Sequence, residues 1–336
     1  MREEYSIDLH QAEPLLRQCG LTPNYKAEYT VGVFEDDELV ATGSLWEDMI
    51  QMMAVSPEHQ GEDLTGTVIT HLIGKAREKG RTNLHLFTKP EKAVMFRGLG
   101  FRQVAVARPY AALMEWGRPG IEEYCAQIRE AAGAPAPLTA AMVMNCNPFT
   151  LGHRYLVETA ASQCDKVVIL AVQEDVSVFP FEDRIRLIRE GTADLPNVVV
   201  LPGGRYAVSS LTFPSYFTKE TQLAYAHCAI DAEIFKAHTA PTLGVTRRYV
   251  GTEPLSPVTA IYNQTLKQRL EPEIQVVELP RKEQEGQPIS ASRVRTLLAQ
   301  GDLEGVRPLV PPTTFAYLES EDARPVLEKL RRMGDQ

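Results

Sequence analysis

Apolar, strand-like runs alternate with helical segments from residue 139 almost to the end of the chain. Each run is rich in Val, Ile, Leu or Ala, a composition typical of strands buried on both faces of a sheet. Strands are expected at 139–146, 166–172, 197–201, 243–250 and 274–279, and helices at 152–163, 181–190, 221–236, 257–270 and 293–299. This alternation predicts an α/β domain with a parallel sheet, in which ligands bind beyond the carboxyl ends of the strands.

The residues before this pattern follow a different order. Strands are expected at 28–34, 39–46, 49–55 and 83–88, with one long helix at about 64–79, which indicates a mixed α/β domain. The segment GAPAPL from Gly133 to Leu138 lies between the two parts, and its prolines cannot continue a helix. We therefore predict a first domain at 1–132, a linker at 133–138 and a second domain at 139–336.

Composition and charge exclude several classes of protein. The 336 residues are 44% hydrophobic and 24% charged, as in globular proteins, and 35 basic against 44 acidic residues give a net charge of −9. Sequence-blind nucleic-acid binding needs basic residues that neutralise phosphates, so no nucleic-acid partner is expected. No apolar run has the length of a membrane helix or a signal peptide, and the five cysteines stand at no zinc-ligand spacing. We expect a cytoplasmic protein without membrane contact and without a metal site of its own.

The segment that follows the strand at 139–146 carries the strongest phosphate signal. Gly152 allows a ligand to approach the backbone closely, and His153 lies in the first helical turn, where free amides and the helix dipole favour phosphate. Thr150 can donate its hydroxyl to the same oxygens. The predicted nucleotide contacts of this segment are Asn147, Pro148, Phe149, Thr150, Gly152, His153 and Arg154.

A second segment, PISASRVR from Pro288 to Arg295, opens the helix at 293–299. Two hydroxyls, of Ser290 and Ser292, and two arginines form an anion cradle, in which charge-assisted bonds contribute about 1.5–3 kcal/mol each. Taken alone, a serine N-cap with solvated arginines explains this segment equally well. Two such segments at opposite ends of one α/β domain are a specific signal for a nucleotide phosphate site.

The two segments resemble the (T/H)xGH and ISSTxxR motifs of the nucleotidylyltransferase superfamily. The first reads TLGH from Thr150, and the second reads ISASRVR from Ile289, with Ala291 in place of a serine. The resemblance implies a Rossmann-like nucleotidylyltransferase domain. It also implies that the triphosphate is contacted or held by His153, Arg295, Thr150, Ser290 and Ser292.

The first domain resembles the Gcn5-related N-acetyltransferase fold, through MMAVSPEHQG from Met52 and MFRGLGF from Met95. That family binds the pyrophosphate of coenzyme A with a glycine-rich loop at a helix start. From Gln60 this chain reads QGEDLT, so Glu62 and Asp63 put negative charge where the anion would lie. We therefore expect a degenerate cofactor loop that does not bind acetyl-CoA tightly, and a scaffolding or docking role.

Over its whole length the chain resembles the citrate lyase ligase family, through NCNPFTLGHRYLVE from Asn145, RYVGTEP from Arg248 and ISASRVR from Ile289. The resemblance implies that ATP, with Mg²⁺, activates acetate as acetyl-adenylate. The acetyl group then passes to the thiol of the phosphoribosyl-dephospho-CoA group on the acyl-carrier subunit of citrate lyase, with release of AMP and diphosphate. Gly251 and Glu253, at the expected end of a strand, are candidate ATP contacts at the adenine or ribose.

Two other functions fit the same residues. One is an adenylyltransferase that joins AMP to a phosphorylated cofactor precursor such as phosphopantetheine, and the other is a non-catalytic binding protein. ATP–diphosphate exchange with and without acetate separates the three. The acidic segment 319–322 and the last helix, at 326–332, are expected to lie on the surface.

Overall fold

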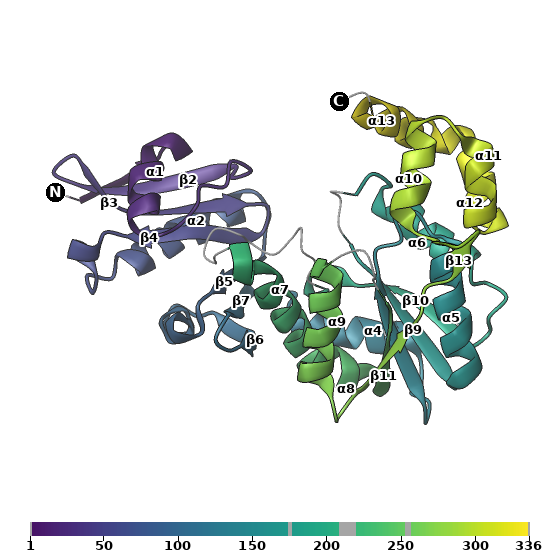
Figure 1. The fold of residues 1–336 in the computed structure, drawn as a ribbon. Coiled ribbons are helices and arrows are strands. Elements are labelled where there is room, and N and C mark those ends of the chain that lie inside the picture. The colour runs from purple at the N-terminus through teal and green to yellow at the C-terminus, as the bar shows by residue number, and fades with distance from the viewer. Residues whose placement is uncertain (1, 174–176, 208–219, 253–256, 335–336) are drawn as a thin grey trace. The chain divides into compact units, whose positions relative to one another are not determined.

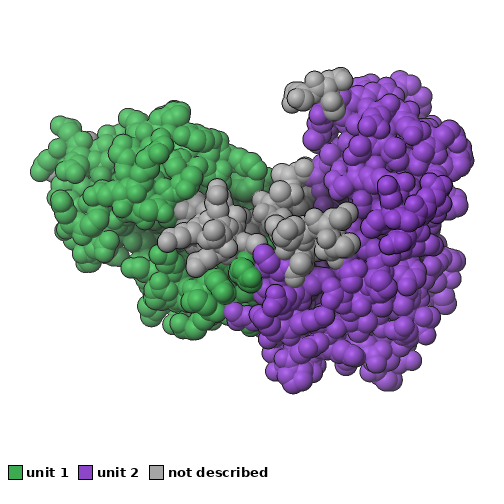
Figure 2. All heavy atoms as spheres, in the orientation of Figure 1, with its two compact units in different colours: residues 1–124, 213–233 green, residues 125–212, 234–336 purple. Residues whose placement is uncertain are grey.

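The computed structural model describes residues 2–173, 177–207, 220–252 and 257–334 (Figure 1). The chain forms two compact units (Figure 2). Unit 1 comprises Met1–Tyr124 and Phe213–Glu233, and unit 2 comprises Cys125–Thr212 and Ile234–Gln336. This division differs from the predicted domain limits, because it falls within a helix before the linker and assigns a later segment to the first unit.

Unit 1 is built on a seven-stranded sheet in the order β1-β2-β3-β4-β5-β7-β6. Its strands are β1 (Arg2–Ser6), β2 (Tyr29–Glu35), β3 (Glu38–Trp46), β4 (Met49–Val55), β5 (Asn83–Thr88), β6 (Arg102–Ala107) and β7 (Ala111–Gly117). Its helices include α1 (Leu9–Gln18), α2 (Leu64–Glu78) and α3 (Ala93–Gly98). Apart from the parallel pair β4–β5 all neighbours are antiparallel, which confirms the predicted mixed α/β architecture.

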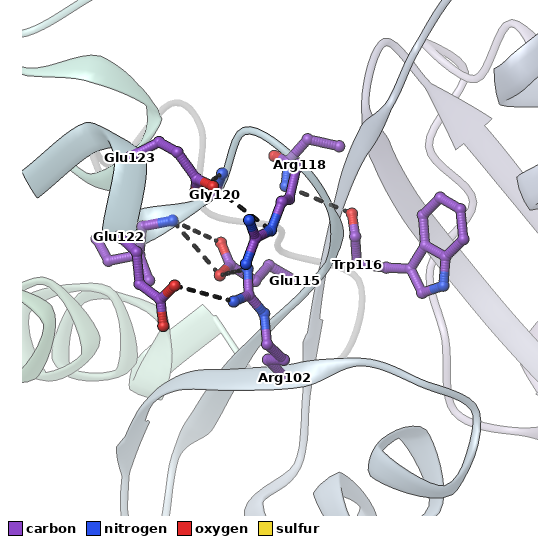
Figure 3. Close-up of polar contacts among 9 residues, drawn as sticks. Arg102, Glu115, Trp116, Arg118, Gly120, Glu122 and Glu123 are labelled. Atoms are coloured by element: carbon purple, nitrogen blue, oxygen red, sulfur yellow. Dashed lines mark hydrogen bonds and ion pairs between the residues drawn. The ribbon is translucent and has the colours of Figure 1, made fainter. Parts of the chain in front are cut away.

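A buried carboxylate determines where α4 (Ile121–Ala132) begins (Figure 3). Glu115 of β7 is fully buried, and its Oε1 accepts a hydrogen bond of 2.9 Å from Nη2 of Arg102. Its Oε2 accepts the backbone N–H of Ile121 at 3.1 Å, which satisfies one of the orphan amides at the helix start. A Cβ at Gly120 would lie 2.7 Å from Nη2 of Arg102 and 2.8 Å from Oε1 of Glu115, so a larger residue there would displace this ion pair.

Unit 2 contains a five-stranded parallel sheet in the order β10-β9-β8-β11-β12, as the alternation of strands and helices predicts. The strands are β8 (Thr139–Met144), β9 (Lys166–Ala171), β10 (Val198–Pro202), β11 (Val245–Gly251) and β12 (Gln275–Leu279). The helices are α5 (Leu151–Gln163), α6 (Phe181–Glu190), α8 (Ala240–Leu243), α9 (Pro257–Leu270), α10 (Ala291–Ala299), α11 (Leu303–Val306), α12 (Pro312–Glu319) and α13 (Arg324–Gly334). A short hairpin, β13 (Glu283–Gln284) and β14 (Gln287–Pro288), precedes α10. The helix α7 (Glu220–Ile234), which comes before α8 in the chain, belongs to unit 1 except for its last residue.

The chain order of the strands reverses at β8. From β8 the sheet extends through β9 and β10 on one side and through β11 and β12 on the other. The crossover from β8 to β9 and the crossover from β10 to β11 therefore run in opposite directions along the sheet, and in such sheets ligands bind at the carboxyl ends of the strands where this reversal occurs. The loop from Asn145 to Thr150 begins at this point, so the topology places the first predicted motif at the switch point of the sheet.

The last helix is exposed at Glu328, Lys329, Arg331 and Arg332, as expected of a surface helix, but one of its faces is buried. In α13, Val326 and Leu330 are both buried and belong to the main hydrophobic core of unit 2. They stand four residues apart, so they share one face of the helix, and α13 packs with that face against α10 (Figure 1). Because charged residues separate Val326 and Leu330 in the sequence, the sequence pattern did not indicate this narrow apolar stripe. The acidic segment before it is exposed at Glu319, Glu321 and Asp322.

None of the helices in the described ranges has the length and apolarity that a membrane crossing needs. All five cysteines are free thiols, and four of them are buried.

Candidate active site

Thr150 and His153 form a reciprocal cap at the start of α5. Thr150 is extended (φ −118°, ψ 167°), and its Oγ1 accepts the backbone N–H of His153 at 3.4 Å. In return, Nδ1 of His153 accepts the backbone N–H of Thr150 at 3.0 Å. An amide N–H can only donate, so Nδ1 must be an acceptor and the neutral ring carries its proton on Nε2.

The surroundings of His153 keep the ring neutral. Burial and the positive charge of Arg281 lower the pKa of His153 to about 4. The ring of Phe149 stacks on the imidazole, with 5.9 Å between ring centroids and an interplanar angle of 14°. At neutral pH His153 is therefore an uncharged, oriented hydrogen-bond donor at Nε2, and not a cation.

The two predicted motifs meet in the fold. A Cβ at Gly152 would lie 2.8 Å from the carbonyl oxygen of Ile289, so the first turn of α5 touches the start of the second motif. Nη1 of Arg295 donates to the carbonyl oxygen of Asn147 at 2.6 Å, and Nη2 donates to Oγ of Ser292 at 3.3 Å. Burial lowers the pKa of Arg295, but an arginine stays protonated at neutral pH. Arg295 thus places a positive charge beside the first motif.

The start of α10, like the start of α5, has a hydroxyl N-cap. Ser290 is the extended N-cap, and its Oγ accepts the backbone N–H of Arg293 at 3.1 Å. The hydroxyl proton of Ser290 can still be donated to an anion. Nη1 of Arg293 is buried and has no hydrogen-bond partner in the part of the chain that the structure describes. Two helix starts, each with a hydroxyl cap, therefore lie together with Arg295 between them.

Arg154, a predicted nucleotide contact, binds two acidic residues of unit 2 in this structure. Its Nε donates to Glu158 at 2.7 Å, and its two Nη atoms bind both carboxylate oxygens of Asp194 at 2.6 Å. Nη1 also donates to the carbonyl oxygen of Gly191, at the end of α6. The hydrogen bonding that Arg154 donates to the Asp194 carboxylate is the main reason that the pKa of Arg154 is raised. These bonds hold the guanidinium of Arg154 at the end of α6, and they stabilise the packing of α5 against α6.

The remaining predicted contacts divide into two groups. Asn147, Pro148 and Phe149 form the loop before α5, where Oδ1 of Asn147 accepts the backbone N–H of Phe179 at 3.0 Å and Phe149 is buried. Gly251 ends β11, and its carbonyl oxygen accepts a hydrogen bond of 3.0 Å from Nδ2 of Asn263. Glu253 lies outside the described residues.

Arg184 is a site-building residue that the sequence motifs do not include. It is fully buried and donates to the carbonyl oxygens of Asn145 at 2.9 Å, Val172 at 2.7 Å and Phe179 at 3.0 Å. It therefore ties the loop after β8 to the loop after β9. One signal was present in the sequence: Arg184 stands in the apolar stripe of α6 that contains Phe181, Ile185 and Ile188.

Unit 1 contains a separate cavity of about 840 Å³. β4 and β5 pair at only one position, Met49 with His85, and the diverging strands line the cavity with residues such as Met53 and Phe87. The loop from Gln60 to Thr65 borders it. Asp63 in this loop has a left-handed backbone (φ 57°) and forms no side-chain cap bond with α2. The cavity is large enough for a ligand, but an acidic residue occupies the helix start that faces it.

Three comparisons with known proteins are informative. Residues 139–318 match the family described as the citrate lyase ligase C-terminal domain. The citrate pro-3S-lyase ligase of Klebsiella pneumoniae is 43% identical over 309 residues, 90% of either chain, and that of Escherichia coli (strain K12) is 41% identical over 313 residues, 91% of this chain and 88% of its own. In unit 1 the chain is similar to the ribosomal-protein-S18-alanine N-acetyltransferase of Escherichia coli, with 16% identity, a TM-score of 0.30, and coverage of 36% of this chain and 97% of that one.

Proposed function

This chain belongs to the citrate lyase ligase family, an enzyme family of the ligase class, and from this we propose that it acetylates citrate lyase at the expense of ATP. In the first step acetate and ATP give acetyl-adenylate and diphosphate. In the second step the thiol of the phosphoribosyl-dephospho-CoA group, on the acyl-carrier subunit of the lyase, takes the acetyl group and AMP leaves. The family membership supports the substrates, and the geometry of unit 2 supports the division of roles that follows.

The chemistry requires activation because a carboxylate is a poor electrophile. An acetate oxygen attacks the α-phosphorus of ATP, where a new P–O bond forms as the bond to diphosphate breaks. The thiolate then attacks the carbonyl carbon of acetyl-adenylate, and the C–O bond to AMP breaks. The enzyme can accelerate both steps by holding the reactants in line and by stabilising charge on the phosphate, without a covalent nucleophile of its own.

His153 is the proposed donor to the α-phosphate. Its Nδ1 is occupied by the backbone N–H of Thr150, so its Nε2–H is available in one orientation. The contact between Arg295 and the carbonyl oxygen of Asn147 is the single observation that carries the proposal, because it joins the two motifs at the switch point. Ser290 and Ser292 then supply hydroxyl donors, and the amides of the first turns of α5 and α10 favour the same anion.

Mg²⁺ is proposed only as part of the substrate MgATP. The described residues contain no group of three or more His, Cys, Asp or Glu side chains that could hold a metal ion. The described side chains that line the two helix starts are hydroxyls, an imidazole and arginines, whereas Mg²⁺ prefers carboxylate and other oxygen ligands. The residues therefore do not fit a Mg²⁺ site supplied by the protein, and no step of the mechanism depends on one. The free thiols fit a reducing compartment, and we place the reaction in the cytoplasm.

The direct test is ATP–diphosphate exchange with purified protein, measured with and without acetate. Exchange that depends on acetate, followed by acetyl transfer to the carrier thiol, is the expected result. Exchange that needs a phosphorylated precursor such as phosphopantetheine would instead identify an adenylyltransferase. Absence of exchange under both conditions would indicate that unit 2 is a non-catalytic binding module.

A further inference from the structure

The segment from Lys89 to Arg97 in unit 1 is exposed and carries a net positive charge. It consists of a 3₁₀ helix at Pro90–Lys92 and of most of α3. Ala93 and Phe96 of α3 are buried in the core of unit 1, which anchors the segment. The exposed side chains of the segment, which we call the α3 surface, are Lys89, Glu91, Lys92, Val94, Met95 and Arg97.

The cations of the α3 surface have no carboxylate partner. Lys89, Lys92 and Arg97 form no ion pair and no side-chain hydrogen bond with the residues that the structure describes, Glu91 and Asp63 included. Other cations of unit 1 are bound to carboxylates, namely Arg17, Lys75, Lys79, Arg81, Arg102 and Arg118. The positive charge of the α3 surface is therefore not neutralised within the described chain, although the protein has a net charge of −9.

Two apolar side chains stand among these charges. Val94 is 63% exposed and Met95 is 39% exposed. Among the described residues the other exposed large hydrophobic side chains are those of Tyr5, Tyr25 and Met333, and no two of these are neighbours in the sequence. Single exposed apolar residues are common and need no explanation. An adjacent pair surrounded by charged residues has instead the composition of a protein contact, with an apolar centre and a polar rim.

We propose that the α3 surface docks an acidic face of the acyl-carrier subunit of citrate lyase. The proposal rests on the function proposed above, in which this subunit must reach the enzyme, receive the acetyl group and leave. Uncompensated cations attract a partner of opposite charge, and they steer its approach. A nucleic acid fits the α3 surface less well, because the protein has a net charge of −9 and the six side chains include no aromatic ring on which a base could stack.

The size of the α3 surface suits a partner that binds briefly. A stable interface takes about 20–30 residues from each partner, whereas small, charge-steered contacts are typical of transient complexes. An enzyme that modifies many copies of one carrier has to release each of them after the reaction. A small patch with unpaired charges combines fast association with fast release, since charge acts mainly on the rate of association.

The experiment compares the parent with the double variant Lys92→Glu, Arg97→Glu and with a control double variant, Arg129→Glu, Arg331→Glu. The control changes the net charge equally, at two exposed arginines of α4 and α13 that have no carboxylate partner among the described residues. Binding to purified citrate lyase is measured by surface plasmon resonance at low and high salt. We expect the Lys92/Arg97 variant to bind the lyase about 10- to 100-fold more weakly than the parent at low salt, and with less salt dependence. The control should bind as the parent does.

A third variant, Val94→Ser, tests the apolar centre without a change in charge. It should weaken binding to the lyase by about 3- to 10-fold. Neither Val94 nor Arg97 is among the residues that line the cavity of unit 1, so their effects report on the surface and not on a ligand of the cavity. Acetate-dependent ATP–diphosphate exchange without lyase should be the same in all four proteins, whereas KM for the lyase in the acetylation assay should rise in step with the loss of affinity.

Three results would overturn the proposal: a parent that does not bind the lyase, a folded Lys92/Arg97 variant that binds it as the parent does, or a control that loses affinity equally. A Lys92/Arg97 variant that loses affinity for a random single-stranded RNA but keeps its affinity for the lyase would assign the surface to nucleic acid instead. If the double variant does not fold, Val94→Ser decides by the same comparison. A parent that binds the lyase through the α3 surface but shows no acetate-dependent exchange would contradict the proposed function and leave the docking surface intact.

Discussion

The N-termini of two helices in this molecule expose backbone amides that favour an anion, but their N-cap residues differ. α5 in unit 2 begins at Thr150, which is extended and shares a reciprocal cap with His153. α2 in unit 1 begins at Asp63, which is left-handed and makes no side-chain cap bond. Both helices offer free amides to an anion, but only α5 presents uncharged donors there. A helix N-terminus is therefore only half of a phosphate site, and the charge of its neighbours decides whether an anion is favoured.

The surroundings increase this difference. Arg295 lies against the loop before α5, and Arg281 is close enough to act on the pKa of His153. At α2 the preceding residue is Glu62, and the carboxylate of Asp63 lies within 2.7 Å of the position of a Cβ at Gly66. Unit 1 nevertheless has a cavity of about 840 Å³ bordered by the loop before α2. The space for a ligand there lies beside a helix start that carries an acidic residue.

The largest expected effect comes from loss of the donor at α5. His153→Ala should lower the rate of acetate-dependent ATP–diphosphate exchange by about 10²–10³, the usual loss for one donor to a developing negative charge. Thermal unfolding of the same variant is the control, because His153 also takes part in the cap of α5. Near-parental exchange by a folded variant would remove His153 from the mechanism.

A smaller loss is expected when the two motifs are forced apart. Gly152→Ala places a Cβ 2.8 Å from the carbonyl oxygen of Ile289, a backbone atom that cannot move alone. Exchange should fall by about 10–100-fold, and stability by about 1–3 kcal/mol. Gly74→Ala is the matched control, since a Cβ there meets no described atom within 4 Å. It should be neutral or stabilising by up to about 1 kcal/mol, because Gly74 lies inside α2. Equal behaviour of the two variants would contradict the close approach.

The pH dependence of stability should report the neutral state of His153. The folded pKa, about 4, lies below the ordinary value of 6.5. Between these values the unfolded chain binds a proton that the folded chain does not, so stability is full above pH 6.5 and falls as pH decreases toward 4. Urea unfolding at pH 7 and pH 5 should therefore show a loss of up to about 2 kcal/mol in the parent that is absent in His153→Gln. The same pH dependence in both proteins would disprove the lowered pKa.

The smallest effect on stability is expected at the start of α2. Asp63→Gly relieves a left-handed conformation but removes an acid that complements the helix dipole, so the two effects offset to within about 1 kcal/mol. The informative measurement on the Asp63→Gly variant is its affinity for acetyl-CoA. Calorimetric titration of the parent with acetyl-CoA should show no micromolar affinity, and Asp63→Gly should bind more tightly than the parent. Micromolar binding by the parent would show that the cofactor loop is not degenerate.

Charged residues explain most of what the sequence could not predict. In α13, the charged residues around Val326 and Leu330 hid the apolar stripe that packs on α10. Arg154 stands in a motif, but its carboxylate partner Asp194 lies on a different segment, 40 positions along the chain. Arg184 and Arg281 stand in no motif, and each donates to a backbone carbonyl that no sequence pattern indicates, that of Val172 and that of Thr252 respectively. The position of a charged residue in the sequence does not indicate which residue or backbone group it will bind in the fold.

The amino-acid sequence by itself determined the parallel sheet of unit 2 and the caps of α5 and α10. These features depend on side-chain periodicity and on hydrogen bonds between residues three positions apart, such as Thr150 with His153 and Ser290 with Arg293. Only the tertiary structure decided that the two caps form one site. The contacts that join them, Arg295 with Asn147 and Gly152 with Ile289, exist because the strand order brings distant segments to one edge of the sheet. Local bonds follow from neighbouring residues, whereas these contacts follow from the folding of the whole domain.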